Sequence, residues 1–178
     1  ATNDDSNGIK LFQDGQPVST ADGNNHSRFL DPLAARHAVF ARGANALTYG
    51  ASNLGGAIDF ISPTARNSLA MQLFLGAGSH GQLNARLTAG GVSGDLDGQV
   101  TVDSLDRDGY RVHSRQDRAG VYANAGWRVS EDLDLRVFAT HVDSDEELAG
   151  PLTRAQFEQD PYQAQPSAIS GNFQLNVR

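Results

Sequence analysis

From Leu69 to the end of the chain, apolar side chains alternate with polar or small ones at a period of two residues. Successive side chains of a β-strand point to opposite faces, so this pattern predicts strands with one apolar and one polar face. The clearest segment sets Leu96, Val100 and Val102 against acidic, amide and hydroxyl side chains. The alternation occurs in six segments, within residues 69–77, 83–89, 96–103, 121–129, 133–140 and 173–178.

The connections between these segments differ in length. Residues 79–81, 92–95 and 129–132 form tight connections, whereas 106–118 and 143–170 are long. An outer-membrane barrel has short turns at one end, longer loops at the other, an apolar face toward lipid and a polar face toward the lumen. A soluble β-sandwich gives the same alternation with its apolar face turned inward. Periodicity alone leaves both architectures open.

The charged residues on the polar face favour the barrel, because charged side chains fit a water-filled lumen. Trp127, beside a tight connection, is then expected in an interfacial aromatic girdle; in a sandwich it would be a core tryptophan. The charged residues of this face are Arg86, Asp95, Asp97, Asp103, Arg128, Asp134 and Arg136.

Residues 1–65 follow a different pattern, in which short apolar runs are separated by turn signals such as Asp14-Gly15 and Asp22-Gly23. Asp31-Pro32 predicts a short helix, with Asp31 as its N-cap, that runs into an extended stretch. The stretch 42–62 carries glycines at positions 43, 50, 55 and 56. It has no lysine and no P-loop spacing, so we expect these glycines where the backbone turns sharply or is closely approached.

Composition excludes several classes of protein. A net charge of -7 over 178 residues, without a basic cluster, argues against nucleic-acid binding. The chain has no cysteine, hence no disulfide framework and no thiol nucleophile. It also lacks any apolar run approaching the roughly 20 residues of a spanning helix.

No catalytic or cofactor motif has the context it needs. The stretch GAGSHG (76–81) matches a dinucleotide-binding pattern, but the residues after Gly81 alternate instead of opening a helix, so a hairpin turn is preferred. SLDRDG (104–109) is expected to form a turn, because the twelfth position of a calcium loop would be Arg115. The stretch 141–147 is expected to be a solvated acidic loop in preference to a metal site. We therefore predict no enzyme activity, no cofactor and no metal.

The segments GIKLFQDGQPVSTADG (8–23) and LDPLAARHAVFARGANALTYGASNLGGAIDFIS (30–62), with the alternating segments after them, resemble in order part of a TonB-dependent outer-membrane receptor. The plug of that family carries Asp-Gly, Arg-Gly, Tyr-Gly and Gly-Gly pairs. The matching pairs here are Asp14-Gly15, Arg42-Gly43, Tyr49-Gly50 and Gly55-Gly56. The stretch 147–166 looks like the third outer loop of many members.

The resemblance implies a mainly β fold with two domains. Residues 1–65 would be the later part of a plug domain, small and of mixed α/β structure. Residues 66–178 would form about six antiparallel strands of an incomplete transmembrane β-barrel, whose complete form has about 22 strands around the plug. The glycines, with Asp14 and Arg42, would then shape the plug.

The resemblance also implies a function and a location. We expect a fragment of a receptor in the bacterial outer membrane that binds and imports a scarce nutrient, most simply a ferric siderophore or similar iron chelate. The TonB protein would supply energy through a region outside this chain, and outer-membrane lipid would surround the barrel. Asn25, His26 and Arg28 fall where a plug apex meets ligand, and Tyr49 matches an apical tyrosine.

The chain departs from the family pattern at two positions. Members often carry acidic residues before Arg-Gly that help to tie the plug to the barrel, and Arg36 and Val39 occupy those positions here. Arg42 could still pair with acids of the barrel. Two alternative functions remain, a soluble β-sandwich binding module and an enzyme with a nucleotide cofactor at residues 76–81.

Overall fold

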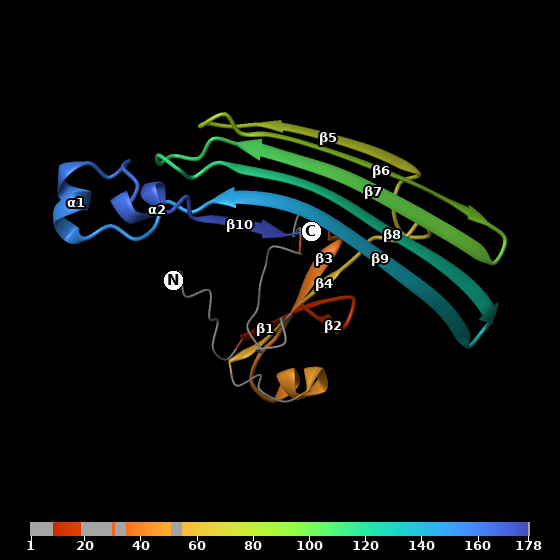
Figure 1. Ribbon diagram of the computed structural model, residues 1–178. Coiled ribbons are helices and arrows are strands. Elements are labelled where there is room, and N and C mark those ends of the chain that lie inside the picture. Colours follow the sequence, from red (N-terminus) through yellow and green to blue (C-terminus); the bar gives the residue numbers. More distant parts are fainter. Residues whose placement is uncertain (1–8, 19–29, 31–34, 51–54, 178) are drawn as a thin grey trace. The chain divides into compact units, whose positions relative to one another are not determined.

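The computed structural model describes residues 9–18, 30, 35–50 and 55–177 (Figure 1). The chain divides into two compact units, residues 1–63 and 64–178. In the part of the chain that the structure describes, each unit contains one sheet. The helix predicted to start at Asp31 lies outside the described residues, while the extended stretch expected after it is present. No helix among the described residues has the length and apolar character needed to span a membrane.

The first unit is built on a mixed sheet with the strand order β2-β1-β4-β3. Strands β1 and β4 are parallel, and the other two pairs are antiparallel. A 3-10 helix, η2 (Gly43–Tyr49), connects β3 to β4. The strands are β1 (Ile9–Gln13), β2 (Gln16–Pro17), β3 (His37–Ala41) and β4 (Gly56–Ile61).

The core of this unit is small and made mostly of alanine. Phe12, Ala41, Ala46 and Ala57 are buried, and the ring of Tyr49 lies 4.9 Å from that of Phe12. Alanine at these positions lets η2 approach the sheet closely while Phe12 supplies most of the apolar surface. The core therefore combines β1, β3, β4 and η2 within about fifty residues of sequence.

The Asp14-Gly15 pair forms the turn between β1 and β2, as its sequence predicted. Both residues have positive φ, at 52° and 77°, which is the requirement of a two-residue hairpin turn. The Asp14 carboxylate accepts hydrogen bonds from the backbone N and Oγ of Ser62, at 2.8 and 2.6 Å. Asp59 accepts one from the backbone N of Gly15 at 3.1 Å. The turn is thus fastened to β4 and to the residue that follows it.

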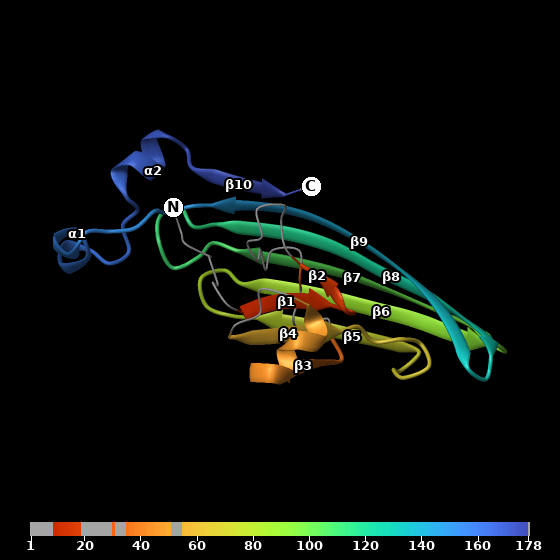
Figure 2. The same ribbon diagram turned by 90° about the horizontal axis from the view of Figure 1, so that it is seen from below.

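The second unit contains a six-stranded antiparallel sheet in the order β10-β9-β8-β7-β6-β5. Figure 2 shows its longer strands side by side along the sheet. Two short helices, α1 (Arg154–Gln159) and α2 (Pro166–Ser170), lie between β9 and β10. The strands are β5 (Met71–Ala77), β6 (Leu83–Ser93), β7 (Leu96–Arg107), β8 (Gln116–Ser130), β9 (Leu133–Glu147) and β10 (Gln174–Val177).

Burial in this sheet is the reverse of that in a soluble protein. On β7, Leu96, Val100 and Val102 are 58%, 47% and 42% exposed. Their polar neighbours Asp97, Gln99 and Thr101 are 7%, 4% and 4% exposed. A β-sandwich would bury the apolar face, so that alternative is wrong. The arrangement is that of barrel strands, apolar outside and polar inside.

The mainly β fold with open barrel strands is confirmed, although several details differ from the sequence expectation. The acidic stretch 141–147 is not a loop, because β9 continues through it to Glu147. Strand β6 continues through Gly90 and Gly91, and β8 and β9 reach 15 residues each. The tight turn at 79–81 lies at the same end of the sheet as the long connections (Figure 1).

The exposed apolar face generates a first prediction. We expect Val100→Arg to lower the unfolding free energy in lipid vesicles by about 2–4 kcal/mol, because it places a charge near the middle of a lipid-facing band. The same change at Leu96, at the start of β7, should cost roughly 0–1 kcal/mol. Urea unfolding followed by heat-modified gel mobility measures both. Equal costs at the two positions would contradict a lipid-facing band.

The conformation of Gly56 generates a second prediction. Gly56 has φ of 143°, and a Cβ there would lie 2.7 Å from the carbonyl oxygen of Ala41. Gly56→Ala should therefore destabilise the first unit by about 1–3 kcal/mol. We expect faster amide hydrogen exchange in β1 and β4, by roughly five- to 150-fold. Gly91→Ala is the control, since a Cβ at Gly91 meets nothing within 4 Å. If Gly56→Ala leaves β1 and β4 as well protected from exchange as in the wild type, the predicted clash at Gly56 is contradicted.

Candidate functional site

Three connections of the second unit meet at one end of its sheet: residues 78–82, 108–115 and 148–173. The first two touch, because the backbone N of Asp108 donates to the carbonyl of His80 at 2.9 Å. The rings of His80 and Tyr110 also lie edge to face at 6.4 Å. The GAGSHG stretch ends in this turn, and β6 follows at Leu83 without a helix. A hairpin turn is therefore confirmed in place of a cofactor loop.

The connection 148–173 has a local framework of its own. Thr153 and Gln156 form a capping box at the start of α1, each side chain bonding the other's backbone N. Pro166 occupies the first turn of α2, where its missing N–H costs nothing. Ala149 before α1, Ala164 between the two helices and Ala168 within α2 are buried. Small side chains thus let the connection fold tightly on itself.

Arg111 joins the two longer connections. Its Nε and Nη2 donate to the carbonyl of Gln163 at 3.0 and 2.9 Å, and Nη2 also donates to the carbonyl of Ala149 at 3.4 Å. The backbone N of Val112 donates to the carbonyl of Tyr162 at 2.9 Å. His113 adds a third link, with Nε2 3.0 Å from the carbonyl of Phe173. The two connections are therefore held as one structure.

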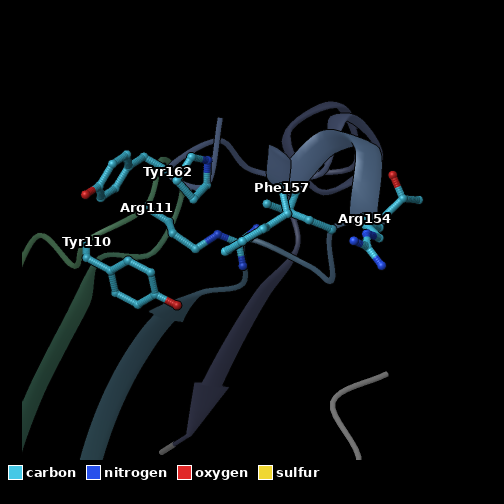
Figure 3. A pocket seen from close by; sticks show the side chains of 8 residues that line it. Tyr110, Arg111, Arg154, Phe157 and Tyr162 are labelled. Atoms are coloured by element: carbon cyan, nitrogen blue, oxygen red, sulfur yellow. The ribbon is translucent and has the colours of Figure 1, made fainter. Parts of the chain in front are cut away.

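An open cleft of about 690 Å³ lies between them (Figure 3). Three aromatic rings line it, and rings of this kind stack on flat or apolar ligand groups. Arg154 lies at the cleft with its side chain 91% exposed and forms an ion pair with Glu158 of its own helix, at 2.8 Å. The volume is in the usual range for a small-molecule site. The lining residues are Tyr110, Arg111, Leu152, Thr153, Arg154, Phe157, Pro161 and Tyr162.

Sequence reasoning did not find this cleft. A signal was available, since Tyr110, Phe157 and Tyr162 are aromatic residues outside the strands and all lie in the two longest connections between strands of the second unit. What the sequence could not supply is the pairing of Arg111 with carbonyls about fifty residues away, which brings the two groups together. The cleft thus depends on long-range contacts.

The polar face of the sheet carries charged side chains, as expected, and the structure shows that some of them form ion pairs. Nη1 of Arg118 donates to Asp103 at 2.7 Å, and its Nη2 donates to the hydroxyl of Tyr122. The side chains of Arg118 and Asp103 are 9% and 5% exposed. Gly120 leaves the space for Asp103, because a Cβ at Gly120 would lie 2.3 Å from Oδ1 of Asp103. This face is polar but its buried charges are compensated.

Among the ligand candidates of the first unit, Asn25, His26 and Arg28 lie outside the described residues. Tyr49 ends η2 and packs against the core through Phe12. Burial, and next the nearby Asp59 carboxylate, raise the pKa of the Tyr49 phenol, which therefore stays neutral at physiological pH. Its structural contacts are established, and its role toward a ligand stays a prediction.

The residues expected to shape the first unit lie at its turns. Gly43, with φ of 60°, is the first residue of η2, and Gly50, with φ of 91°, is its C-cap residue. Arg42 is the exposed N-cap residue of η2. Gly55 is exposed just before β4, where Gly56 begins. In the described part of the chain no group of His, Asp and Glu side chains could hold a metal ion.

The relatives of the chain agree with this architecture, although no protein-family model matches it. The hemin receptor of Yersinia enterocolitica is 26% identical over 142 residues, which cover 72% of this chain and 20% of that protein. The hemin receptor of Yersinia pestis is 26% identical with nearly the same coverage, 72% and 21%. The chain therefore spans about a fifth of the length of these curated relatives.

Solved structures of outer-membrane receptors have the same fold. The pyoverdine receptor FpvA of Pseudomonas aeruginosa, bound to pyoverdine, aligns with a TM-score of 0.63 at 23% identity, over 77% of this chain and 21% of its own. The ferric-catecholate import receptor Fiu of E. coli K12 aligns at 0.64 and 22%, over 80% and 21%. The unliganded ferric citrate transporter FecA aligns at 0.69 and 16%, over 90% and 26%.

These relatives are transport receptors and not enzymes, and they are proteins of the bacterial outer membrane, in agreement with the predicted class and location. The hairpin at residues 76–81 and the exposed apolar sheet had already removed the two alternatives. In sequence and in fold the chain resembles the TonB-dependent outer-membrane receptors, and its two sheets match strands of their plug and of their barrel.

Proposed function

We propose that this chain is part of a receptor that imports an iron chelate across the bacterial outer membrane with energy from TonB. The observation that carries the proposal is the presence, in one chain, of a plug-like sheet and a sheet with a lipid-compatible outer face and a polar inner face. Residues 1–65 would act as plug and residues 66–178 as barrel wall. The relatives named for hemin, pyoverdine, ferric catecholate and ferric citrate support an iron chelate as the ligand class.

The cleft between residues 108–115 and 148–173 is the proposed first contact for that ligand. Its aromatic rings would stack on flat ligand groups, and Arg154 would attract the negative charge that such chelates carry. The bonds of Arg111 keep the two walls together before a ligand arrives. A wall fixed in advance lowers the ordering cost of binding.

We also propose that Asn25, His26, Arg28 and Tyr49 supply further ligand contacts from the plug. His26 and Arg28 offer an imidazole and a guanidinium, which suit carboxylate or phenolate groups of a chelate. Burial and the Asp59 carboxylate, with which its hydroxyl is hydrogen-bonded, raise the pKa of the Tyr49 phenol, so the neutral hydroxyl would offer its oxygen as an acceptor. Ligand would then pass from a loop cleft to these plug residues.

Uptake in living cells tests the proposal as a whole. Cells lacking the gene are grown under iron limitation with haem, ferric citrate or ferric pyoverdine as the only iron source, and the full-length gene is returned. We expect growth and accumulation of radiolabelled iron to recover with at least one of these probes, and only when TonB is present. Recovery with none of the probes, or recovery without TonB, would reject the proposed function.

The cleft gives a more local prediction. Phe157→Ala should weaken binding of the accepted probe by about tenfold, because it removes an aromatic surface worth roughly 1.5 kcal/mol or more. Ile169→Ala is the matched control, since Ile169 is an exposed apolar residue of the same connection that does not line the cleft. Equilibrium binding to purified receptor in detergent measures both. An equal effect of the two variants would argue against the cleft.

A further inference from the structure

The first residues of the second unit fold into a compact segment before the barrel strands begin. We call residues 64–68 the linker, because they follow Pro63, the last residue of the first unit. The side chain of Asn67 accepts from the backbone N of Thr64 at 2.8 Å, and the backbone N of Asn67 donates to the carbonyl of Thr64 at 3.0 Å. Ser68 Oγ donates to the same carbonyl at 2.7 Å. The linker is therefore a closed turn.

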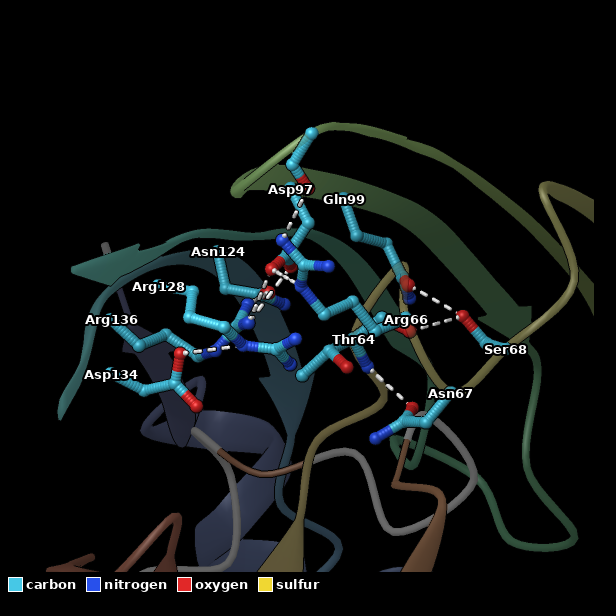
Figure 4. Close-up of polar contacts among 11 residues, drawn as sticks. Thr64, Arg66, Asn67, Ser68, Asp97, Gln99, Asn124, Arg128, Asp134 and Arg136 are labelled. Carbon is cyan, nitrogen blue, oxygen red and sulfur yellow. Dashed lines mark hydrogen bonds and ion pairs between the residues drawn. The ribbon is translucent and has the colours of Figure 1, made fainter. Parts of the chain in front are cut away.

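The linker is also bonded to the polar face of the sheet. Nε of Arg66 donates to Oδ2 of Asp97 at 2.7 Å, and Nη2 donates to the carbonyl of Gly94 at 3.2 Å. Ser68 bonds the side chain of Gln99 at 2.7 Å. Figure 4 shows Arg66 and Ser68 reaching neighbouring positions of the same strand. Two side chains of the linker thus bond Asp97 and Gln99, which point to the same face of β7.

Asp97 lies between two guanidinium groups. Its other partner is Arg136 of β9, whose Nη2 is 2.8 Å from Oδ1 of Asp97 and whose Nη1 donates to Asn124 at 2.6 Å. The Asp97 side chain is 2% exposed, whereas those of Arg66 and Arg136 are 24% and 22% exposed. A carboxylate so buried needs its partners, because breaking a buried pair leaves an uncompensated charge.

Two glycines leave the space that this arrangement occupies. A Cβ at Gly126 would lie 2.2 Å from Nη2 of Arg136 and 2.8 Å from Oδ2 of Asp97. A Cβ at Gly90 would lie 3.2 Å from Cβ of Ala65, the linker residue beside Arg66, and 2.8 Å from a backbone oxygen. The polar face of the sheet therefore leaves space for the linker at these glycines and also forms hydrogen bonds with it.

We propose that Arg66, Asp97 and Arg136 form a clamp that anchors the linker to the polar face of the sheet. Resting on the proposed function, in which residues 1–63 would move as a plug during import, the clamp keeps the linker in place during that movement. The clamp begins three residues after Pro63, so movement of the first unit would end at the linker and would not reach β5. Arg136 on β9 forms an ion pair with Asp97 on β7, so the clamp spans the three neighbouring strands β7, β8 and β9. The linker is then a stationary attachment point.

Limited trypsin digestion tests the clamp, because trypsin cleaves after arginine and Arg66 is held in it. The full-length protein in detergent micelles is digested, and cleavage between Arg66 and Asn67 is followed by mass spectrometry. Wild-type protein should be cut there at least tenfold more slowly than after Arg154, which is 91% exposed. Asp97→Asn should speed cleavage after Arg66 by about tenfold or more, with heat-modified gel mobility unchanged.

Asp134→Asn is the matched control, an identical change in an exposed ion pair with Arg128, at 3.6 Å, toward the same end of the sheet. It should leave cleavage after Arg66 as in the wild type. Should Asp97→Asn fail to fold, Ser68→Ala removes the second bond of the linker and should speed cleavage two- to fivefold. Wild-type cleavage after Arg66 as fast as after Arg154, or no change in the clamp variants, overturns the proposal.

A disulfide tests whether the linker stays in place. Within these 178 residues there is no cysteine, and any cysteine elsewhere in the full-length receptor is first replaced by serine. Ser68→Cys with Gln99→Cys then introduces one defined pair where the two side chains now bond. The oxidised variant should import the accepted probe as fast as the reduced variant. Import by the reduced form alone would mean that the linker detaches, which overturns the proposal. The digestion needs no ligand, so its result is separate from that of the proposed function.

Discussion

The structure of the second unit depends on the reversal of burial across its sheet. An apolar face exposed over this many strands is stable only against a surface that does not need hydrogen bonds, and lipid is such a surface. Once the apolar residues face outward, the polar ones must share the interior, and their charges must be matched there because they are shielded from water. The pairs Arg118 with Asp103 and Arg136 with Asp97 meet that requirement.

The strand content and the division into an apolar and a polar face could be predicted from the sequence, because a period of two is a local property of the chain. The outward direction of the apolar face does not follow from that period and needed the charges on the polar face as well. The same holds for the Asp14-Gly15 turn, whose residues accept positive φ. Local pattern was misleading at residues 141–147, where acidic side chains suggested a loop. Pairing with β8 holds these residues in β9 instead, so cross-strand hydrogen bonds prevail over the local preference of charged residues.

The candidate site was much less predictable, for a physical reason. Tyr110 and Phe157 belong to the same cleft because Arg111, Val112 and His113 bond carbonyls of the later connection, and no local pattern encodes those contacts. Arg66 is a similar case, since a lone arginine between two segments carries no sign of its partner thirty-one residues away. The resemblance to a family supplied the plug residues, whereas the cleft and the clamp required side-chain geometry.

The glycines of β8 have an implication for how such a wall can change over generations. The space at Gly126 is occupied by side chains from β7 and β9, so a larger residue there is compatible only with a shorter one at position 97 or 136. Gly120 and Asp103 stand in the same relation. These positions are expected to covary among descendants of this sequence, and drift at any one of them is restricted by residues far away along the chain.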